Sequence, residues 1–423
     1  SPTFKFVTLK LAKSPFTNKL PPTVKSPVIL PAPVTSNVEP SNVKFASELT
    51  VVPSTDVIIR LFPVFVYDVI AAGNSLNTVY LQDELYLADY NLTVVAGLRY
   101  DWFESDDKPN FNQAFTSANG GLRNDTNIDG LDLLMPRLGF TWEANYNLTV
   151  RGGAGLYSGG NPNVWISNAW SNDGLTNVQL QNRNFNGARS VFSNWELSGA
   201  GRPGYDVPQE MIDQVANTTA DSASNSFLVL IDPNYEQPSE WKLALGGTYT
   251  FDSGLSVDAD FLYSIANDAA YYVDVSQEQI GVTTTGQPIF DYATGRDNFM
   301  LTNSDREAKS TSFSLVARHD YDFGLDWMVG YAFTDAEDIS PMTSSTAGSN
   351  FDNLAANTIV NPEPGISNYN TPHRITARLS YGKEFFAGYE SRITAMFYRK
   401  QGQGQSHVMG SVDLEGDGAF GRH

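Results

Sequence analysis

The sequence predicts an all-β protein whose antiparallel strands form a transmembrane β-barrel. Three observations predict this fold. Segments of about ten residues alternate apolar side chains with polar or glycine residues, the spacing of a strand with two different faces. These segments come in pairs joined by short turns, and long polar stretches separate one pair from the next. Short turns at one end and long connections at the other are typical of barrels of the outer-membrane type.

The stretch 136–163 shows the pattern most clearly. Leu138, Phe140 and Trp142 share one face of its first strand, because alternate side chains of a strand point to the same side. Arg137 and Thr141 point to the other face. The turn and the start of the second strand read ANYNLTV from position 144, and the similar ADYNLTV begins 56 residues earlier. The hairpin is therefore an internal repeat.

Five such hairpins predict ten strands. They lie at residues 77–102, 136–157, 241–265, 312–333 and 374–399, and a further strand-like stretch precedes them at 57–69. Strands of about ten residues are long enough to cross a bilayer when tilted. The long connections, at 103–135, 158–238, 267–310, 335–372 and from 400 onward, are predicted to be extracellular loops, and the short turns periplasmic.

Composition narrows the class of protein. The chain has 423 residues, no cysteine and a formal net charge of -20. Without cysteine there is neither a disulfide framework nor a cysteine metal site. The negative charge argues against a nucleic-acid partner, which would require a basic surface. No run of about 18 apolar residues is present to form a membrane-spanning helix.

Two regions differ in composition. Residues 1–72 contain no glycine, ten of the 22 prolines and, in the first 50 positions, six lysines against two acidic residues. Residues 73–423 are acidic and rich in glycine. We expect an atypical proline-rich arm, or an insecure stretch of sequence, at 1–72 and the barrel hairpins with their long loops at 73–423.

The barrel region resembles the TonB-dependent receptor family, in particular its large Oar-like outer-membrane receptors. The resemblance spans about residues 75–405 and rests on the order of six segments: YLQDELYL from 80, NLTVVAGLRYDW from 91, PRLGFTW from 136, LTVRGGAGLYSGGNPNVWISNAW from 148, DPNYEQPSEWKLALGGTYTF from 232 and TPHRITARLSYGKEF from 371. The resemblance implies a 22-stranded barrel with an N-terminal plug, opened by a TonB-type energising protein to import a bound substrate.

The sequence departs from that family in two respects. Neither a plug nor a TonB-contacting box is recognisable ahead of the strands, and residues 410–423 do not resemble a closing barrel strand. We therefore expect part of a barrel, which is completed by further sequence or by other chains, because unpaired strand edges are costly in lipid. Outer-membrane lipid, lipopolysaccharide and other envelope proteins are the expected partners.

Candidate site residues are few. We expect six arginines to face the lumen and to pair with acidic groups there or on a plug, with a structural role outweighing substrate contact: Arg99, Arg137, Arg151, Arg318, Arg374 and Arg378. A weak Ca²⁺ candidate is formed by Asp413, Glu415 and Asp417, followed by the acidic stretches 104–107, 124–132 and 335–338. The more frequent role of such stretches is a solvated loop. The four histidines, at 319, 373, 407 and 423, lack metal-site spacing.

No serine, histidine and aspartate arrangement or phosphate-binding loop is indicated, so we expect no enzyme and no cofactor. The leading hypothesis is a receptor that imports an unidentified substrate across the bacterial outer membrane. A porin-like or structural barrel within a larger envelope complex is the alternative. A secreted β-rich adhesin or glycan-binding protein is a second alternative, which a detergent requirement of the purified chain would contradict.

Overall fold

A computed structural model describes residues 57–61, 65–69, 74–159, 163–176, 216–217, 219, 228–284, 286, 288–292, 297–356, 358 and 361–406. The chain divides into two units, residues 1–45 and 46–423, and every described residue lies in the second. The division of the sequence at residue 72, made on composition, stays a prediction.

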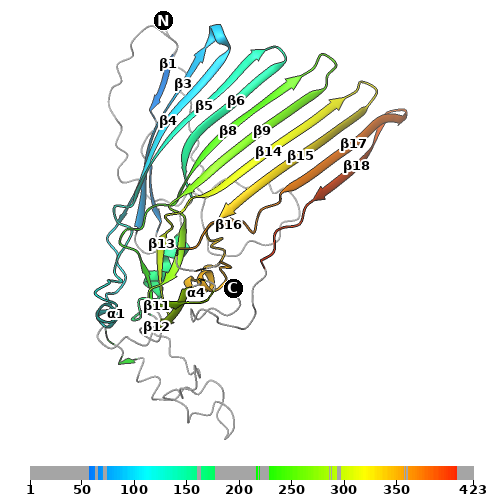
Figure 1. Cartoon of the computed structure of the whole chain (residues 1–423). Coiled ribbons are helices and arrows are strands. Elements are labelled where there is room, and N and C mark those ends of the chain that lie inside the picture. The colour runs from blue at the N-terminus through cyan, green and yellow to red at the C-terminus, as the bar shows by residue number, and fades with distance from the viewer. Residues whose placement is uncertain are drawn as a thin grey trace. The chain divides into compact units, whose positions relative to one another are not determined.

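One antiparallel sheet of 13 strands dominates this unit (Figure 1). The ten predicted hairpin strands are all present and pair in chain order. They are β3 (Asn74–Leu87), β4 (Leu92–Ser105), β5 (Asp132–Asn145), β6 (Leu148–Ser158), β8 (Ser239–Thr250), β9 (Ser256–Asn267), β14 (Ala308–Asp320), β15 (Leu325–Asp338), β17 (His373–Phe386) and β18 (Tyr389–Lys400). A strand of 14 residues is about 45 Å long, and at a tilt near 45° it spans the ~30 Å of a hydrocarbon core.

The strand-like stretch at 57–69 forms two strands, not one. They are β1 (Val57–Leu61) and β2 (Phe65–Val69), and both pair with β3 in antiparallel register. Because Pro63 lies between them, a single ladder through this stretch would lack one backbone donor. In the described part of the chain, β1 and β18 end the order of paired strands and do not pair with each other.

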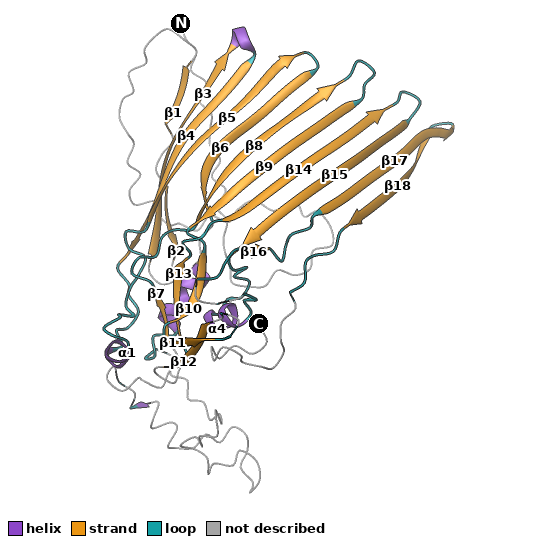
Figure 2. Cartoon of the chain, viewed as in Figure 1, coloured by secondary structure: helices purple, strands orange, loops and turns teal. Residues whose placement is uncertain are grey.

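Short turns join the strands of each hairpin at one end of the sheet (Figure 2). The β3–β4 turn contains a 3-10 helix, Ala88–Tyr90, and ends at Asn91, whose φ is 47°. Gly254, Gly324 and Gly388 supply the positive φ that three other turns require. The predicted turns are confirmed.

The two faces of the sheet differ as the alternation predicts. One face carries leucine, valine and aromatic side chains that remain exposed; Leu138 is 56% exposed and Leu379 52%. A leucine side chain gains about 1.5–3 kcal/mol when it leaves water, so a face built of such residues requires an apolar environment. We call this the apolar face and the opposite one the polar face.

The long connections contain structure that the sequence analysis did not predict. At the end of the sheet away from the short turns (Figures 1 and 2), they form α1 (Gln113–Ala118), α2 (Asn163–Ser171), β7 (Leu228–Ile231), β10 (Ala270–Asp274), β11 (Gln277–Val282), β12 (Pro288–Tyr292), β13 (Asn298–Asn303), α4 (Ala347–Asp352) and β16 (Gly365–Ile366). Strands β10, β13 and β7 make a three-stranded sheet, in which β13 and β7 are parallel.

This small sheet and helices α2 and α4, which we call the loop core, bury a hydrophobic cluster. Val229 and Leu301 of the small sheet, Ile166 of α2 and Phe351 of α4 are at most 4% exposed and pack in one cluster with Phe103 of β4. Five separate segments of the sequence therefore meet in one packed core. These connections are not simple polar loops.

Candidate functional site

All six predicted arginines lie on the polar face. Residues that lie directly opposite each other on neighbouring strands point to the same face of a sheet. Opposed pairs followed from strand to strand, from β4 to β17, place all six arginines on one face. The alternation in the sequence was sufficient to predict that these side chains share one face, because a strand that is polar on only one face has a defined register. That this face lines the lumen stays a prediction.

Three of these arginines pair with carboxylates of the same face. Arg99 Nε lies 2.8 Å from Asp101 Oδ1, and Arg151 Nη2 lies 2.6 Å from Asp260 Oδ1. Arg318 Nη2 is 3.5 Å from Asp258 Oδ2. Their partners are two residues along the same strand or on nearby strands, so these guanidinium groups are neutralised within the sheet itself.

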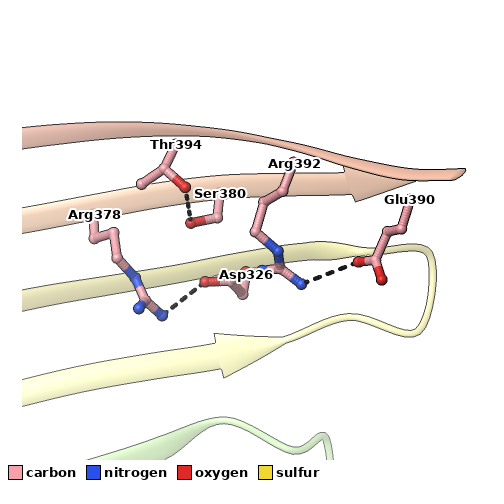
Figure 3. Close-up of polar contacts among 6 residues, drawn as sticks. All are labelled: Asp326, Arg378, Ser380, Glu390, Arg392 and Thr394. Carbon is pink, nitrogen blue, oxygen red and sulfur yellow. Dashed lines mark hydrogen bonds and ion pairs between the residues drawn. The ribbon is translucent and has the colours of Figure 1, made fainter. Parts of the chain in front are cut away.

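A fourth arginine belongs to a larger network near the short-turn end (Figure 3). Arg378 Nη2 and Arg392 Nη1 each donate a hydrogen bond of 2.7 Å to a different oxygen of Asp326, which is 8% exposed. Arg392 also lies 3.7 Å from Glu390. One buried carboxylate therefore joins strands β15, β17 and β18. Arg392 and Asp326 were not among the predicted site residues, because the register that brings them together is not visible in the alternation.

The remaining two arginines differ from these four. Among the described residues, no carboxylate contact is seen for Arg374 or Arg137. The Arg137 guanidinium carbon instead lies 4.4 Å from the ring centre of Tyr157, and Lys242 Nζ lies 5.8 Å from the same ring. Lys242 also pairs with Glu240 at 2.9 Å. Two cations thus approach one aromatic ring from the strands on either side of β6.

A hollow of about 640 Å³ lies beside this group. Its lining includes Gln82, Arg137, Arg151, Lys242 and Asp260 of the polar face, with several glycines between them. Three cationic side chains and one carboxylate give the lining a positive balance. A hollow of this volume is in the range that holds a small ligand.

The glycines of this region have two roles. A β-carbon on Gly139 would meet only the carbonyl oxygen of Gly152, at 3.7 Å, so the floor of the hollow is open there. A β-carbon on Gly153 would lie 2.7 Å from the carbonyl oxygen of Leu138, and one on Gly246 would collide with Asp260. Glycine at positions 153 and 246 therefore permits the close approach of backbone and side-chain atoms within the sheet.

The loop core contains a second electrostatic feature. Asp274, at the end of β10, is 7% exposed, and its Oδ1 accepts hydrogen bonds from the backbone N–H groups of Ser276 (2.9 Å) and Asn298 (3.0 Å). Burial raises the pKa of this carboxyl to about 7, and the two backbone donors oppose that shift. Asp274 is a buried acid that titrates near neutral pH.

The metal and histidine candidates of the sequence take part neither in the charged pairs of the polar face nor in the Asp274 site, as far as the described residues show. No group of three or more histidine, cysteine or acidic side chains suited to a metal ion is found in the described part of the chain. Asp413, Glu415, Asp417, His407 and His423 lie outside the described residues. Of the other two histidines, His319 Nε2 is 2.7 Å from the carbonyl oxygen of Ser253, and His373 Nδ1 is 2.8 Å from the Tyr331 hydroxyl.

The sheet has one exposed apolar face and one charged face, as the wall of a membrane-spanning barrel does. The family model for the outer membrane beta barrel domain matches residues 69–396. The chain belongs to this outer membrane beta barrel family. The family places the protein in the bacterial outer membrane, with the apolar face toward lipid. Among the described residues, each helix is too short or too polar to traverse a bilayer.

The solved structures that match the chain are distant in sequence. The outer membrane transporter YddB from Escherichia coli is 14% identical, with a TM-score of 0.43 over 81% of this chain and 35% of that one. The ferric enterobactin receptor PfeA from Pseudomonas aeruginosa is 9% identical, with a TM-score of 0.42 over 78% and 33%. The FrpB iron transporter from Neisseria meningitidis is 13% identical, with a TM-score of 0.38 over 79% and 33%.

This outer membrane beta barrel spans about a third of the length of those solved structures. No curated protein matches the chain.

Proposed function

We propose that the chain forms part of the wall of a TonB-dependent receptor-type transporter that imports a substrate across the outer membrane. The observation that carries this proposal is the polar face, which stays charged and hydrogen-bonded from β3 to β18 while the opposite face is mainly apolar, with Asp83 of β3 among its few charges. A barrel wall of this kind has its polar face toward an aqueous interior. The six quoted sequence segments favour the receptor family over other barrels.

The loop core supports a receptor in preference to an open pore. Packed segments from the long connections can present a defined binding surface at one end of the barrel, whereas solvated loops would order only on binding. We therefore propose a transport role and no catalysis. The identity of the substrate would depend on that surface and on any plug.

Conductance of the complete protein distinguishes this proposal from its alternative. Reconstituted in a planar bilayer, a plugged transporter should show no sustained conductance, and a periplasmic TonB-type protein should be captured by a cysteine cross-linker placed in the short turns. A permanently open, ohmic channel that captures no such protein would instead establish the porin-like alternative. The cysteine-free chain makes single-site labelling direct.

A further inference from the structure

Arg137, one of the two cations around Tyr157, differs from the four arginines of the polar face that are paired with a carboxylate. Arg99, Arg151, Arg318 and Arg378 each contact a carboxylate. Arg137 contacts an aromatic ring and, among the described residues, no carboxylate. A guanidinium group stacked on a ring retains its five N–H donors at the edge of its plane. Arg137 is therefore held in a fixed place with its donors available.

The second cation is held near the first by the register. Gly155 of β6 lies between Arg137 of β5 and Lys242 of β8 in one row of the sheet. Strands lie about 4.8 Å apart, so the two side chains start about 10 Å apart and converge on the Tyr157 ring. Lys242 is paired with Glu240 at 2.9 Å, so Arg137 is the cation of the two that lacks a carboxylate among the described residues, and an anion beside it would be attracted by its charge.

The floor and lining of the hollow fit such an anion. Gly139 leaves the backbone uncovered beside Arg137, and the hollow extends to Gln82, whose amide can donate a hydrogen bond. Among the described residues that line the hollow, Asp260 is the only carboxylate, and it is engaged by Arg151 at 2.6 Å. A guanidinium group can bind a planar carboxylate with two parallel hydrogen bonds.

We infer that the hollow bordered by Arg137, Gln82, Gly139 and Lys242 is a binding site for a carboxylate group, with Arg137 as its principal ligand. The carboxylate belongs either to a small solute in the barrel interior or to an acidic polypeptide segment that enters it. This site rests on the proposed placement of the polar face toward an aqueous interior.

The test uses a single cysteine and two thiol reagents of opposite charge. Ala244, on the polar face between Lys242 and Gly246, lines the hollow, and Ala244→Cys adds one sulfur atom there. Ser312→Cys is the matched control, because the residues opposite it, Leu262 and Thr334, are uncharged. Both variants are reacted with a methanethiosulfonate bearing a sulfonate and with one bearing a trimethylammonium group.

The site predicts that Ala244→Cys reacts preferentially with the anionic reagent, relative to Ser312→Cys. Adding Arg137→Gln should lower that preference about threefold, the change expected for one charge removed at about 10 Å in a largely aqueous setting. Arg374→Gln, elsewhere on the polar face, should leave it unchanged. Millimolar citrate or penta-glutamate should slow the reaction at Ala244→Cys, and Arg137→Gln should abolish this protection.

The outcomes separate the site from the function on which it rests. Protection by citrate alone indicates a small solute, and protection by penta-glutamate alone indicates an acidic segment. If Ser312→Cys reacts but Ala244→Cys shows neither charge preference nor protection, the carboxylate site is wrong and the aqueous polar face stands. If neither cysteine reacts with either reagent, the interior placement of the polar face is wrong, and the site falls with it.

Discussion

The ring of Phe140 lies across the backbone of Gly152, its directly opposed neighbour on the next strand. A β-carbon at Gly152 would lie 2.7 Å from Cε1 of Phe140 and 3.0 Å from the carbonyl oxygen of Ala244. The glycine thus allows an aromatic ring to lie flat on the apolar face, where it covers backbone that would otherwise be exposed to lipid.

Gly152→Ala should therefore destabilise the barrel by about 1–3 kcal/mol, the usual cost of overpacking. The ring can rotate away, but the Ala244 carbonyl belongs to the ladder and cannot. Equilibrium unfolding in detergent micelles measures the change. Gly139→Ala is the matched control in the same hairpin, because the nearest atom lies 3.7 Å away. Equal stability of the two variants would show that the close approach of the Ala244 carbonyl does not exclude a side chain at Gly152.

Asp326 should be the most sensitive charged residue of the polar face. Asp326→Asn leaves Arg378 and Arg392 without their shared carboxylate, and we expect a loss of about 1–3 kcal/mol, less than for a fully buried pair because the arginines are half exposed. Combining it with Arg378→Gln in a double-mutant cycle should show non-additivity. Arg374→Gln, on the same face of β17, should change stability little. Additive losses would mean that the network does not act as one unit.

The loop core should become less stable as pH rises toward 8. The folded-state pKa of Asp274 is about 7 and lies above its ordinary value of 3.8, so the folded state binds the proton more tightly. Below about pH 3.8 the carboxyl is protonated in both the folded and the unfolded protein. Between about pH 4 and pH 7 it ionises in the unfolded protein but stays protonated in the folded one, so the loss of folding stability grows over this range. Above the folded pKa it reaches on the order of 2–4 kcal/mol.

Asp274→Asn removes this titration and should flatten the pH dependence. Trp165 and Trp170 of α2 pack against the buried cluster of the loop core, so their fluorescence can report its thermal unfolding at pH 5 and pH 8. The difference in Tm between the two pH values should be smaller in the variant than in the wild type. The same pH difference in both proteins would exclude Asp274 as its source.

Asp173 should hold the first two long connections together. It is 1% exposed, and its carboxylate accepts hydrogen bonds from Asn110 Nδ2 (2.8 Å) and from the Thr176 backbone N–H (2.6 Å). Asp173→Ala should open this junction and speed trypsin cleavage after Arg123 at least about tenfold, since each buried donor left unpaired costs about 1–3 kcal/mol.

Asp125→Asn provides the comparison for this experiment. It removes the ion pair with Arg123, which is 57% exposed at its side chain, and such a pair contributes at most about 1 kcal/mol. Cleavage should therefore change little. The barrel itself should unfold at the same temperature in both variants; a lower barrel Tm in Asp173→Ala would show that the loop core and sheet unfold together.

Several elements were predictable from local pattern. The ten strands and their turns follow from strict alternation and from glycines such as Gly254 and Gly324, whose positive φ is inexpensive only for that residue. The face of each arginine follows from the same period of two. The acidic partners of the arginines could not be predicted in this way. Asp326 of β15 binds Arg392 of β18, with β17 between the two strands. The register between strands depends on how they pair and cannot be read from either segment alone.

The alternation along each strand is enough to predict a sheet with one apolar and one polar face, because a period of two is a local property of each strand. The loop core and the hollow instead arise from contacts between strands and connections that are distant in the sequence. Val229, Leu301 and Phe351 come from three different connections without periodicity, and Arg137 and Lys242 come from strands about 100 positions apart. Such contacts depend on strand order and register, which bring distant residues together.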